Sequence, residues 1–277
     1  MPANFLDLHI VDYCQLACRH CYLHKGNTSM PLEMIREVST NFLQADLPLP
    51  QSTIILSGGE ALLHPQFGEV CSIVRSLNGY IALSSNGILV PQYIGLFRRN
   101  DGIQISIDGN SRVHDFIRGA GSYENAMRAL RLLDENNIRH SISFTANKQN
   151  LKCIDHIIDL CIETGSYLLN FNLYHPICEN GLDPLSFSDW LSEKRRVKER
   201  VEQEGILCTA TCVEKGCIAG ILGLSVLPDG TYWDCSRNQQ ITGRFPQKIN
   251  DVLLRDAIGR ERCRNQFETC CRRLKYA

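Results

Sequence analysis

Short apolar runs alternate with amphipathic segments from residue 5 to about residue 175. Such alternation is typical of successive βα units, in which each strand of a parallel sheet is followed by a helix that covers it. We count six units. Their predicted strands, each leading into a polar or glycine-bearing loop, are residues 5–11, 53–56, 80–84, 103–107, 141–145 and 168–173.

Apolar residues at helical spacing predict helices between these strands, at residues 32–43, 124–133 and 154–162. Ser122 and Asn150 are suitable N-caps for the last two, because their side chains can accept hydrogen bonds from free backbone N–H groups. Six βα units predict an α/β fold, a partial (β/α)6 TIM-like barrel. In such barrels the loops after the strands carry the functional site.

The predicted barrel occupies residues 1–180. A charged segment at residues 181–206, predicted to be helical over residues 190–204, would connect the barrel to a small domain. That C-terminal domain, residues 207–277, is rich in cysteine. The sequence therefore predicts three parts, of which the first holds the main site.

The overall composition is that of an ordinary globular protein, with 44% hydrophobic residues, 21% charged residues and a formal net charge of -1. A nearly neutral chain gives no electrostatic reason to expect nucleic acid. The N-terminus lacks the basic and apolar regions of a secretion signal, and no apolar run approaches the roughly 18 residues that span a membrane. We therefore expect a cytoplasmic protein that binds neither nucleic acid nor membrane.

Fourteen cysteines are unevenly distributed, with three between residues 14 and 21 and seven between residues 208 and 271. Secreted disulfide scaffolds also concentrate cysteine, but they are usually short, and this chain carries no secretion signal. Metal ligation is therefore the better account of both clusters.

Cys14, Cys18 and Cys21 form a CxxxCxxC motif in the loop after the first predicted strand. Three thiolates from one loop can hold a cuboidal 4Fe-4S cluster and leave its fourth iron open to the amine and carboxylate of a substrate. Structural zinc is the alternative, but a structural zinc site requires a fourth Cys or His ligand, and the nearby His20 and His24 are poorly placed to supply it.

This motif resembles the CxxxCxφC signature of the radical S-adenosylmethionine (SAM) superfamily, with His20 where the family has an aromatic residue. The resemblance implies that SAM chelates the open iron. The reduced cluster would give an electron to the sulfonium, and the resulting 5′-deoxyadenosyl radical would abstract a hydrogen atom from a substrate. By the same resemblance, His20 would pack beside the adenine.

Two further motifs follow the second and third predicted strands. Gly58, Gly59 and Glu60 resemble the family's GGE motif, in which glycines let the backbone approach a ligand and the carboxylate accepts from an ammonium group. Ser84 and Asn86 lie in a segment that resembles the family's TNG-like motif and would offer hydrogen bonds to the ribose or methionyl group. Both segments would otherwise be ordinary turns.

Ser106 and Asp108 lie in an SIDG segment at the end of the fourth predicted strand, and an HDxxRG segment that contains Arg118 follows. Together they resemble radical SAM enzymes that carry a SPASM or twitch C-terminal domain. The resemblance implies that these residues bind SAM, with Ser106 and Arg118 on its carboxylate. A merely solvated Arg118 is the alternative. Thr145 and Asn147 would either reach the adenosine or cap the next helix.

A predicted hairpin turn at Asp229 and Gly230 would bring Cys217 and Cys235 together. The Cx12GxxxxC spacing of these two cysteines resembles the SPASM/twitch signature. The full CxxCxxxxxCxxxC pattern of that signature is absent, so we expect one auxiliary 4Fe-4S cluster. A structural zinc site is the alternative, because four-cysteine zinc sites use similar clips. The ligands implied by the resemblance are Cys212, Cys217, Cys235 and one of Cys263, Cys270 and Cys271.

The sequence does not assign a catalytic acid or base. In some peptide-modifying relatives an Asp immediately follows the GxxxxC cysteine and acts as a base, but here that position is Ser236. Asp234 and Tyr232 could accept a proton instead, although strand alternation could aim them away from the substrate. His175 and Cys178, after the sixth strand, face the site by position; a buried free Cys is the commoner explanation for the latter.

These motifs place the chain nearest to enzymes that mature ribosomal peptides. Our first hypothesis is therefore radical modification of a peptide by crosslinking, thioether formation, epimerisation or oxidation. The second is dehydrogenation or rearrangement of a small molecule such as an aminocyclitol. A non-catalytic iron–sulfur or zinc scaffold is a remote third, because it would not need Gly58, Gly59, Glu60 or Arg118.

The expected partners are the precursor peptide or small molecule and a reductant such as flavodoxin or ferredoxin. Because the cluster motif starts at residue 14, we expect no leader-binding domain before it. A separate recognition protein, or direct binding of the core peptide, would then be needed.

Overall fold

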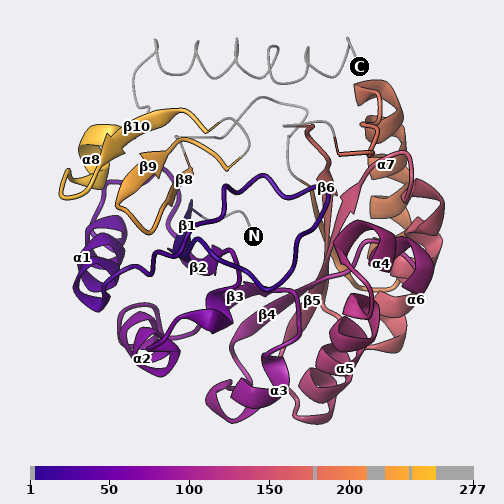
Figure 1. The fold of residues 1–277 in the computed structure, drawn as a ribbon, viewed down its shortest axis with the longest axis horizontal. Coiled ribbons are helices and arrows are strands. Elements are labelled where there is room, and N and C mark those ends of the chain that lie inside the picture. The colour runs from indigo at the N-terminus through magenta and orange to yellow at the C-terminus, as the bar shows by residue number, and fades with distance from the viewer. Residues whose placement is uncertain (1–3, 177–179, 211–221, 237–238, 254–277) are drawn as a thin grey trace. The chain divides into compact units, whose positions relative to one another are not determined.

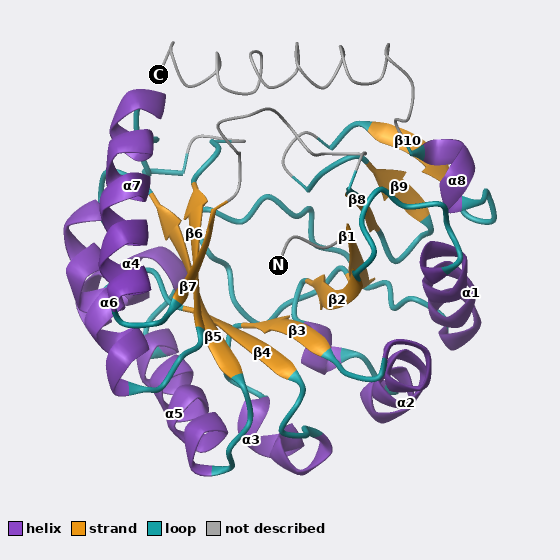
Figure 2. Cartoon of the chain, turned by 180° about the vertical axis from the view of Figure 1, so that it is seen from behind, coloured by secondary structure: helices purple, strands orange, loops and turns teal. Residues whose placement is uncertain are grey.

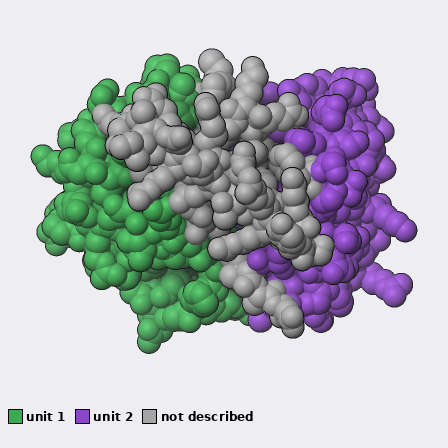
Figure 3. Space-filling model, turned by 90° about the horizontal axis from the view of Figure 1, so that it is seen from above, with its two compact units in different colours: residues 1–15, 22–84, 214–269 green, residues 16–21, 85–213, 270–277 purple. Residues whose placement is uncertain are grey.

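The structure is a computed structural model that describes residues 4–176, 180–210, 222–236 and 239–253. Its contacts divide the chain into two compact units, coloured separately in Figure 3. The first unit comprises residues 1–15, 22–84 and 214–269, and the second comprises residues 16–21, 85–213 and 270–277. Each unit is described by itself.

The first unit is built on parallel strands that carry an antiparallel extension (Figure 1). Its strand order is β10-β9-β8-β1-β2-β3. Strand β1 pairs in parallel with both β2 and β8, whereas β9 is antiparallel to β8 and to β10. The strands are β1 (Asn4–Val11), β2 (Ser52–Gly58), β3 (Ala82–Ser85), β8 (Gly223–Val226), β9 (Thr231–Trp233) and β10 (Ile241–Arg244).

Helices cover one face of these strands because apolar residues alternate along β1. Leu6, Leu8 and Ile10 are fully buried, as are Ile35 and Phe42 of the first helix. The residues between them on β1 point to the opposite face, since successive side chains of a strand alternate. The helical elements of this unit are α1 (Leu32–Leu43), η1 (Ala61–Leu63), α2 (Phe67–Asn78) and α8 (Ile249–Val252).

The second unit holds four parallel strands in the order β4-β5-β6-β7, with helices along one face (Figure 2). The strands are β4 (Gly102–Ser106), β5 (His140–Ala146), β6 (Leu168–Leu173) and β7 (Leu207–Ala210). The helical elements are α3 (Val90–Tyr93), η2 (Ile94–Leu96), α4 (Ser111–Arg118), α5 (Ser122–Glu135), η3 (Leu151–Cys153), α6 (Ile154–Glu163) and α7 (Phe187–Gln203).

A stack of three aromatic rings forms part of the core of the second unit. The ring of Phe171 lies 5.9 Å from that of Phe144 and 6.4 Å from that of Trp190, and the three rings are nearly parallel. All three side chains are fully buried. The stack therefore packs β5, β6 and α7 against one another in the core.

All six predicted strands and the four predicted helices are present, with ends that shift by up to three residues. The prediction of Ser122 as an N-cap is wrong, because α5 begins at Ser122 and its N-cap is Gly121 with a φ of 75°. The Ser122 hydroxyl donates to the Gly119 carbonyl instead. The prediction of Asn150 as the N-cap of the next helix is also wrong, because the N-cap of α6 is Cys153. Asn150 precedes η3 and makes no side-chain capping hydrogen bond there.

The predicted hairpin at Asp229 and Gly230 is confirmed as the connection between β8 and β9. Its first strand pairs with β1, and contacts assign residues 214–269 to the first unit. The expected boundaries at residues 1–180, 181–206 and 207–277 remain a prediction. No helix within the described ranges is long and apolar enough to cross a membrane.

Candidate functional site

The three cysteines of the CxxxCxxC motif lie in one partly exposed loop after β1. Cys14 belongs to the first unit, and Cys18 and Cys21 to the second, where the Cys21 N–H donates to the Cys18 carbonyl over 3.1 Å. None of the three is in a disulfide. Their convergence on one cluster stays a prediction.

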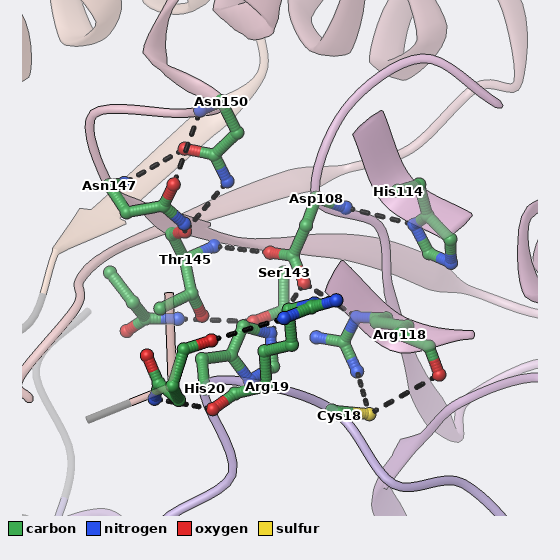
Figure 4. A network of polar contacts seen from close by, with 12 residues as sticks. Cys18, Arg19, His20, Asp108, His114, Arg118, Ser143, Thr145, Asn147 and Asn150 are labelled. Carbon is green, nitrogen blue, oxygen red and sulfur yellow. Dashed lines mark hydrogen bonds and ion pairs between the residues drawn. The ribbon is translucent and has the colours of Figure 1, made fainter. Parts of the chain in front are cut away.

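A buried carboxylate organises the second unit's part of the site (Figure 4). Asp108, two residues beyond β4, is fully buried. Its Oδ2 atom accepts from His20 Nε2 over 2.7 Å and from Arg118 Nε over 2.5 Å, and its Oδ1 atom accepts from the Thr145 backbone N–H over 2.8 Å. One carboxylate therefore links the cysteine loop, α4 and the end of β5.

The charges in this network favour an ionised Asp108. Burial raises the pKa of a carboxyl group, but the charges of Arg118 and His20 outweigh it and hold the pKa of Asp108 far below its usual range. Burial correspondingly lowers the pKa of Arg118, and the charge of Asp108 more than compensates, so this pKa is raised. The pair is a buried ion pair at neutral pH.

Helix α4 presents Arg118 to this carboxylate. Its N-cap is Asn110, whose side chain accepts from the Val113 N–H. One turn later, Nδ1 of His114 accepts from the Asp108 backbone N–H over 3.1 Å. Burial, with the positive charge of Arg118, lowers the pKa of His114 to about 4, so His114 is neutral and its Nδ1 is free of a proton. The neutral ring thus anchors the Asp108 loop to the helix.

Arg118 also lies beside one of the predicted iron ligands. Its Nη1 atom is 4.0 Å from the sulfur of Cys18. A positive charge at this distance favours the thiolate, which is the form that binds iron. Three thiols in one loop, one of them beside a guanidinium, are the donor chemistry of an iron–sulfur cluster, although the described residues do not group Cys14, Cys18 and Cys21 as metal ligands.

The structure gives the other predicted residues of this unit local roles. Ser106 is half-buried at the end of β4, paired with Ser143 of β5. The side chains of Asn147 and Asn150 bond to backbone groups within residues 145–150 and so brace the loop after β5. Only the backbone of Thr145 takes part in the Asp108 contact, so a role for its hydroxyl stays a prediction.

Gly58 and Gly59 lie where the first unit's backbone segments approach closely. A Cβ atom on Gly59 would lie 2.0 Å from the Tyr13 carbonyl oxygen, and Gly58 has a φ of +114° that disfavours any side chain. Glu60 is buried, and its carboxylate accepts from the Leu62 N–H over 3.4 Å at the start of η1. The two glycines therefore let the end of β2 approach the backbone of residues 9–13, which lead into the cysteine loop.

The segment after β3 has the geometry of a turn. The side chain of Asn86 accepts from the Ile88 N–H over 3.0 Å, and Gly87 has a φ of 88°. Ser84 is half-buried at the end of the strand. Binding of SAM by Ser84 and Asn86 remains a prediction beside these turn contacts.

Of the predicted auxiliary ligands, Cys235 lies just beyond β9. Within the described ranges, no three His, Cys, Asp or Glu side chains are grouped as metal ligands. The auxiliary cluster therefore stays a prediction. The remaining candidates lie outside the described residues: Cys212, Cys217, Cys263, Cys270 and Cys271.

The two proton acceptors considered near Cys235 are engaged elsewhere. The side chain of Asp234 is fully buried and accepts from the Gln240 N–H over 3.1 Å. The hydroxyl of Tyr232 donates to the Gln247 carbonyl, and burial raises its pKa to about 12. Of the pair proposed after β6, His175 is half-buried, whereas Cys178 lies outside the described residues.

Sequence reasoning missed a polar cluster around Asp7 and His9 of β1. The signal was available, because these two polar residues alternate with the apolar Leu6, Leu8 and Ile10 of the same strand. It also missed a link in which Arg19 donates to the carbonyls of Phe116 and Asn180, for which we find no sequence signal.

Comparisons with known proteins identify the family and the fold of this chain. The sequence model of the radical SAM superfamily matches residues 8–161, which is more than half of the chain. The chain is 31% identical to pre-heme d1 synthase from Dinoroseobacter shibae, over 59% of this chain and 42% of that protein. It is 28% identical to the sporulation killing factor maturation protein SkfB of Bacillus subtilis, over 58% of this chain and 40% of SkfB. The match spans less than half the length of either relative.

Among solved structures, SuiB from Streptococcus suis bound to S-adenosylmethionine has a similar fold. The TM-score is 0.78 at 14% sequence identity, and the match covers 93% of this chain and 67% of SuiB. The predicted fold class, an α/β partial TIM-like barrel, is confirmed. Family membership implies a 4Fe-4S cluster and SAM as cofactors. The chain belongs to the radical SAM superfamily.

Proposed function

We propose that this chain is a radical SAM enzyme that modifies a ribosomally synthesised peptide. The observation that carries the SAM-binding half of this proposal is the shared carboxylate of Asp108. It holds both His20 and Arg118 beside Cys18, next to the loop that would bind the cluster. A purely structural loop would not need a buried ion pair at this place, because taking two charges out of water is costly.

When bound, the cluster and SAM would supply a 5′-deoxyadenosyl radical that abstracts a hydrogen atom from the substrate. Cys14, Cys18 and Cys21 would hold the cluster. The guanidinium of Arg118 has five N–H groups, and Asp108 takes the one on Nε. The remaining groups can bind a carboxylate, so Arg118 would orient SAM while Asp108 keeps the guanidinium in place.

Two observations support a peptide as the substrate class. SkfB is named for the maturation of the sporulation killing factor, and SuiB has also been solved with its precursor peptide SuiA, at a TM-score of 0.76. The hairpin of β8 and β9, which ends near Cys235, fits the expected SPASM-like part of the chain. We propose one auxiliary 4Fe-4S cluster there, with Cys235 as a ligand.

A second candidate substrate class is an iron-free or iron-bearing tetrapyrrole. Pre-heme d1 synthase, Fe-coproporphyrin III synthase and haem synthases are among the matched relatives, at 26% to 31% identity. The match to Fe-coproporphyrin III synthase of Methanosarcina barkeri covers 79% of this chain. Iron-coproporphyrin III is the product named for this relative, so its further conversion, in the manner of a haem synthase, is the probe of this alternative.

The proposal is tested by anaerobic reconstitution, iron and sulfide counts, and measurement of 5′-deoxyadenosine released from SAM under dithionite. About eight irons per chain and release of 5′-deoxyadenosine are expected for two 4Fe-4S clusters. Cys18→Ala should abolish the release. Cys71→Ala is the matched control, because Cys71 is a buried cysteine of α2 outside both clusters. Release that survives in Cys18→Ala would refute the assignment.

The substrate class is tested with the same preparation and two probes. Peptides encoded by short reading frames beside this gene are incubated with SAM, and mass spectrometry looks for a change in peptide mass. Iron-coproporphyrin III is incubated in parallel. A modified peptide supports the proposal, whereas turnover of the porphyrin alone would replace it with the second candidate.

A further inference from the structure

A polar cluster lies on the face of β1 that the helices do not cover. Asp7 and His9 are two residues apart and therefore point to the same side of the strand. β1 lies between β8 and β2 (Figure 1). In the register of these pairs, Asp7 is opposite Ser225 of β8 and His9 is opposite Ser57 of β2. Both serines carry their hydroxyls into the cluster.

The Asp7 carboxylate accepts four hydrogen bonds. Its donors are Nε2 of His9 over 3.0 Å, the Ser236 hydroxyl over 2.9 Å, the Ser225 hydroxyl over 3.3 Å and the Ser57 hydroxyl. Burial raises the pKa of a carboxyl group, but the interaction with His9 and the hydrogen bonds from the serine hydroxyls outweigh it and lower the pKa of Asp7 to about 2. The carboxylate is therefore ionised at neutral pH and can only accept hydrogen bonds.

The ionised state of Asp7 determines which ring nitrogen of His9 carries the hydrogen of their contact. Because Asp7 only accepts, the Nε2 atom of His9 carries the hydrogen of their contact. In the neutral imidazole the lone pair is then on Nδ1. That atom is buried and has no hydrogen-bond partner among the described residues. The ring is 1% exposed, and its neighbours are the rings of Tyr22 at 6.5 Å and Trp233 at 6.3 Å.

A buried nitrogen without a partner is uncommon, since buried polar atoms in native proteins nearly always have one. An imidazole that is oriented by a carboxylate through one nitrogen, with the other nitrogen open, has the arrangement of a general base. Ser236 ties this pair to the segment that follows Cys235. The cluster therefore joins β1 to the part of the chain for which we propose the auxiliary cluster.

We propose that His9 is a catalytic base that takes a proton from an O–H, N–H or S–H group of the substrate, with Asp7 as its positioning residue. The substrate's H–X bond breaks, its electron pair stays on X, and the proton forms a bond to Nδ1. No electron is transferred in this step. The product is an imidazolium whose positive charge is paired with the Asp7 carboxylate. This inference rests on the proposed function, because the substrate is the one that the radical chemistry modifies.

The first test needs no cluster, SAM or substrate. The protein is labelled with 15N-histidine, and the ring nitrogen signals of His9 are assigned by their loss in His9→Gln. In the neutral ring we expect Nε2 to be protonated and Nδ1 to be bare, because Nε2 donates to Asp7. Asp7→Asn should move the proton to Nδ1, because the amide group can donate to Nε2. A neutral wild-type His9 ring that carries its proton on Nδ1 would overturn the proposal.

The second test uses the reconstituted protein, SAM and the peptide that the mass assay identifies. The readout is the product formed per 5′-deoxyadenosine released, which should fall at least tenfold in His9→Gln and in Asp7→Asn. Imidazole in the buffer should restore part of this ratio in His9→Ala. The control is His140→Gln, which removes another buried histidine whose two ring nitrogens both contact carbonyl oxygens. That variant should keep the wild-type ratio.

The two proposals fail in different ways. A wild-type protein that releases no 5′-deoxyadenosine refutes the proposed function, and the 15N experiment still decides the state of His9. A wild-type protein that forms product, with an unchanged ratio in His9→Gln, refutes His9 as the base and leaves the proposed function intact.

Discussion

Asp108 forms a buried ion pair with Arg118, in which Nε of the guanidinium lies 2.5 Å from Oδ2 of the carboxylate. Asp108 is fully buried, and the side chain of Arg118 is 10% exposed. Both charged groups are shielded from water, so the stability of each charge depends on the other group and on its remaining hydrogen bonds. Loss of either charge would therefore both disturb the candidate site and destabilise the fold.

Asp108→Asn should lower the free energy of unfolding by about 3 to 5 kcal/mol, because it leaves the buried guanidinium without its counter-ion. Urea denaturation of the apo protein measures this change. The matched control is Asp155→Asn, which breaks the exposed pair between Asp155 and Arg196 and should cost less than about 1 kcal/mol. Equal costs for the two variants would contradict the buried pair.

Arg118→Ala should weaken SAM binding by about 1.5 to 3 kcal/mol, roughly 10- to 150-fold in dissociation constant, because it removes a charged hydrogen bond to the SAM carboxylate. Equilibrium dialysis of SAM with the reconstituted protein measures the loss, after circular dichroism has shown that the variant is folded. Arg196→Ala, at an exposed arginine of α7, is the control. Unchanged binding in Arg118→Ala would remove Arg118 from the SAM site.

Gly59→Ala should destabilise the first unit by about 1 to 3 kcal/mol, because its Cβ atom would lie 2.0 Å from the Tyr13 carbonyl oxygen and the backbone would have to move. Gly68→Ala is the matched control. Nothing lies within 4 Å of a Cβ atom on Gly68, which is in α2, so alanine there should be neutral or stabilising by up to about 1 kcal/mol. Thermal unfolding of both variants distinguishes the two positions.

Cys235→Ala should reduce the iron content of the reconstituted protein from about eight to about four atoms per chain, because one cluster of four irons loses a ligand. Iron analysis and the visible absorbance of the clusters measure the change. Cys161→Ala is the control, since Cys161 is fully buried in α6 and is no predicted ligand. An iron content that is the same in both variants would place the auxiliary ligands elsewhere.

The Asp7 carboxylate should make stability depend on pH. Its folded pKa of about 2 lies below the usual 3.8, so its contribution is complete above pH 4 and is lost as the pH falls through 2. The shift corresponds to about 2 kcal/mol. The difference in unfolding free energy between the wild type and Asp7→Asn, measured in urea, should therefore shrink between pH 5 and pH 2. A constant difference would mean that Asp7 is not ionised in the folded protein.

Local periodicity is enough to predict most regular elements of this chain. The strand at Leu168–Leu173 and the helix at Leu32–Leu43 have the predicted ends, because their apolar spacing and their flanking residues agree. Sequence reasoning missed α4 (Ser111–Arg118), which is polar and short. Its position follows from tertiary contacts, such as that of His114 with the backbone of Asp108.

In the candidate site too, local motifs predict which residues take part, and tertiary contacts decide how those residues are arranged. The resemblance of their motifs to those of the family predicts that His20, Asp108 and Arg118 lie beside SAM, since each lies in a segment with a recognisable order along the chain. It did not show that one carboxylate binds the other two residues, because hydrogen bonds between residues 20, 108 and 118 depend on how the loops meet.

The sequence by itself determined the family, the strand and helix order and the cysteine loop, because each depends on residues that are near one another along the chain. Only the tertiary structure decided that Asp7 and His9 form a cluster with Ser57, Ser225 and Ser236. These residues come from β1, from β2 and from the hairpin more than 200 positions later. Their contact requires the parallel pairing of β8 with β1, and local spacing carries no information about which strands pair.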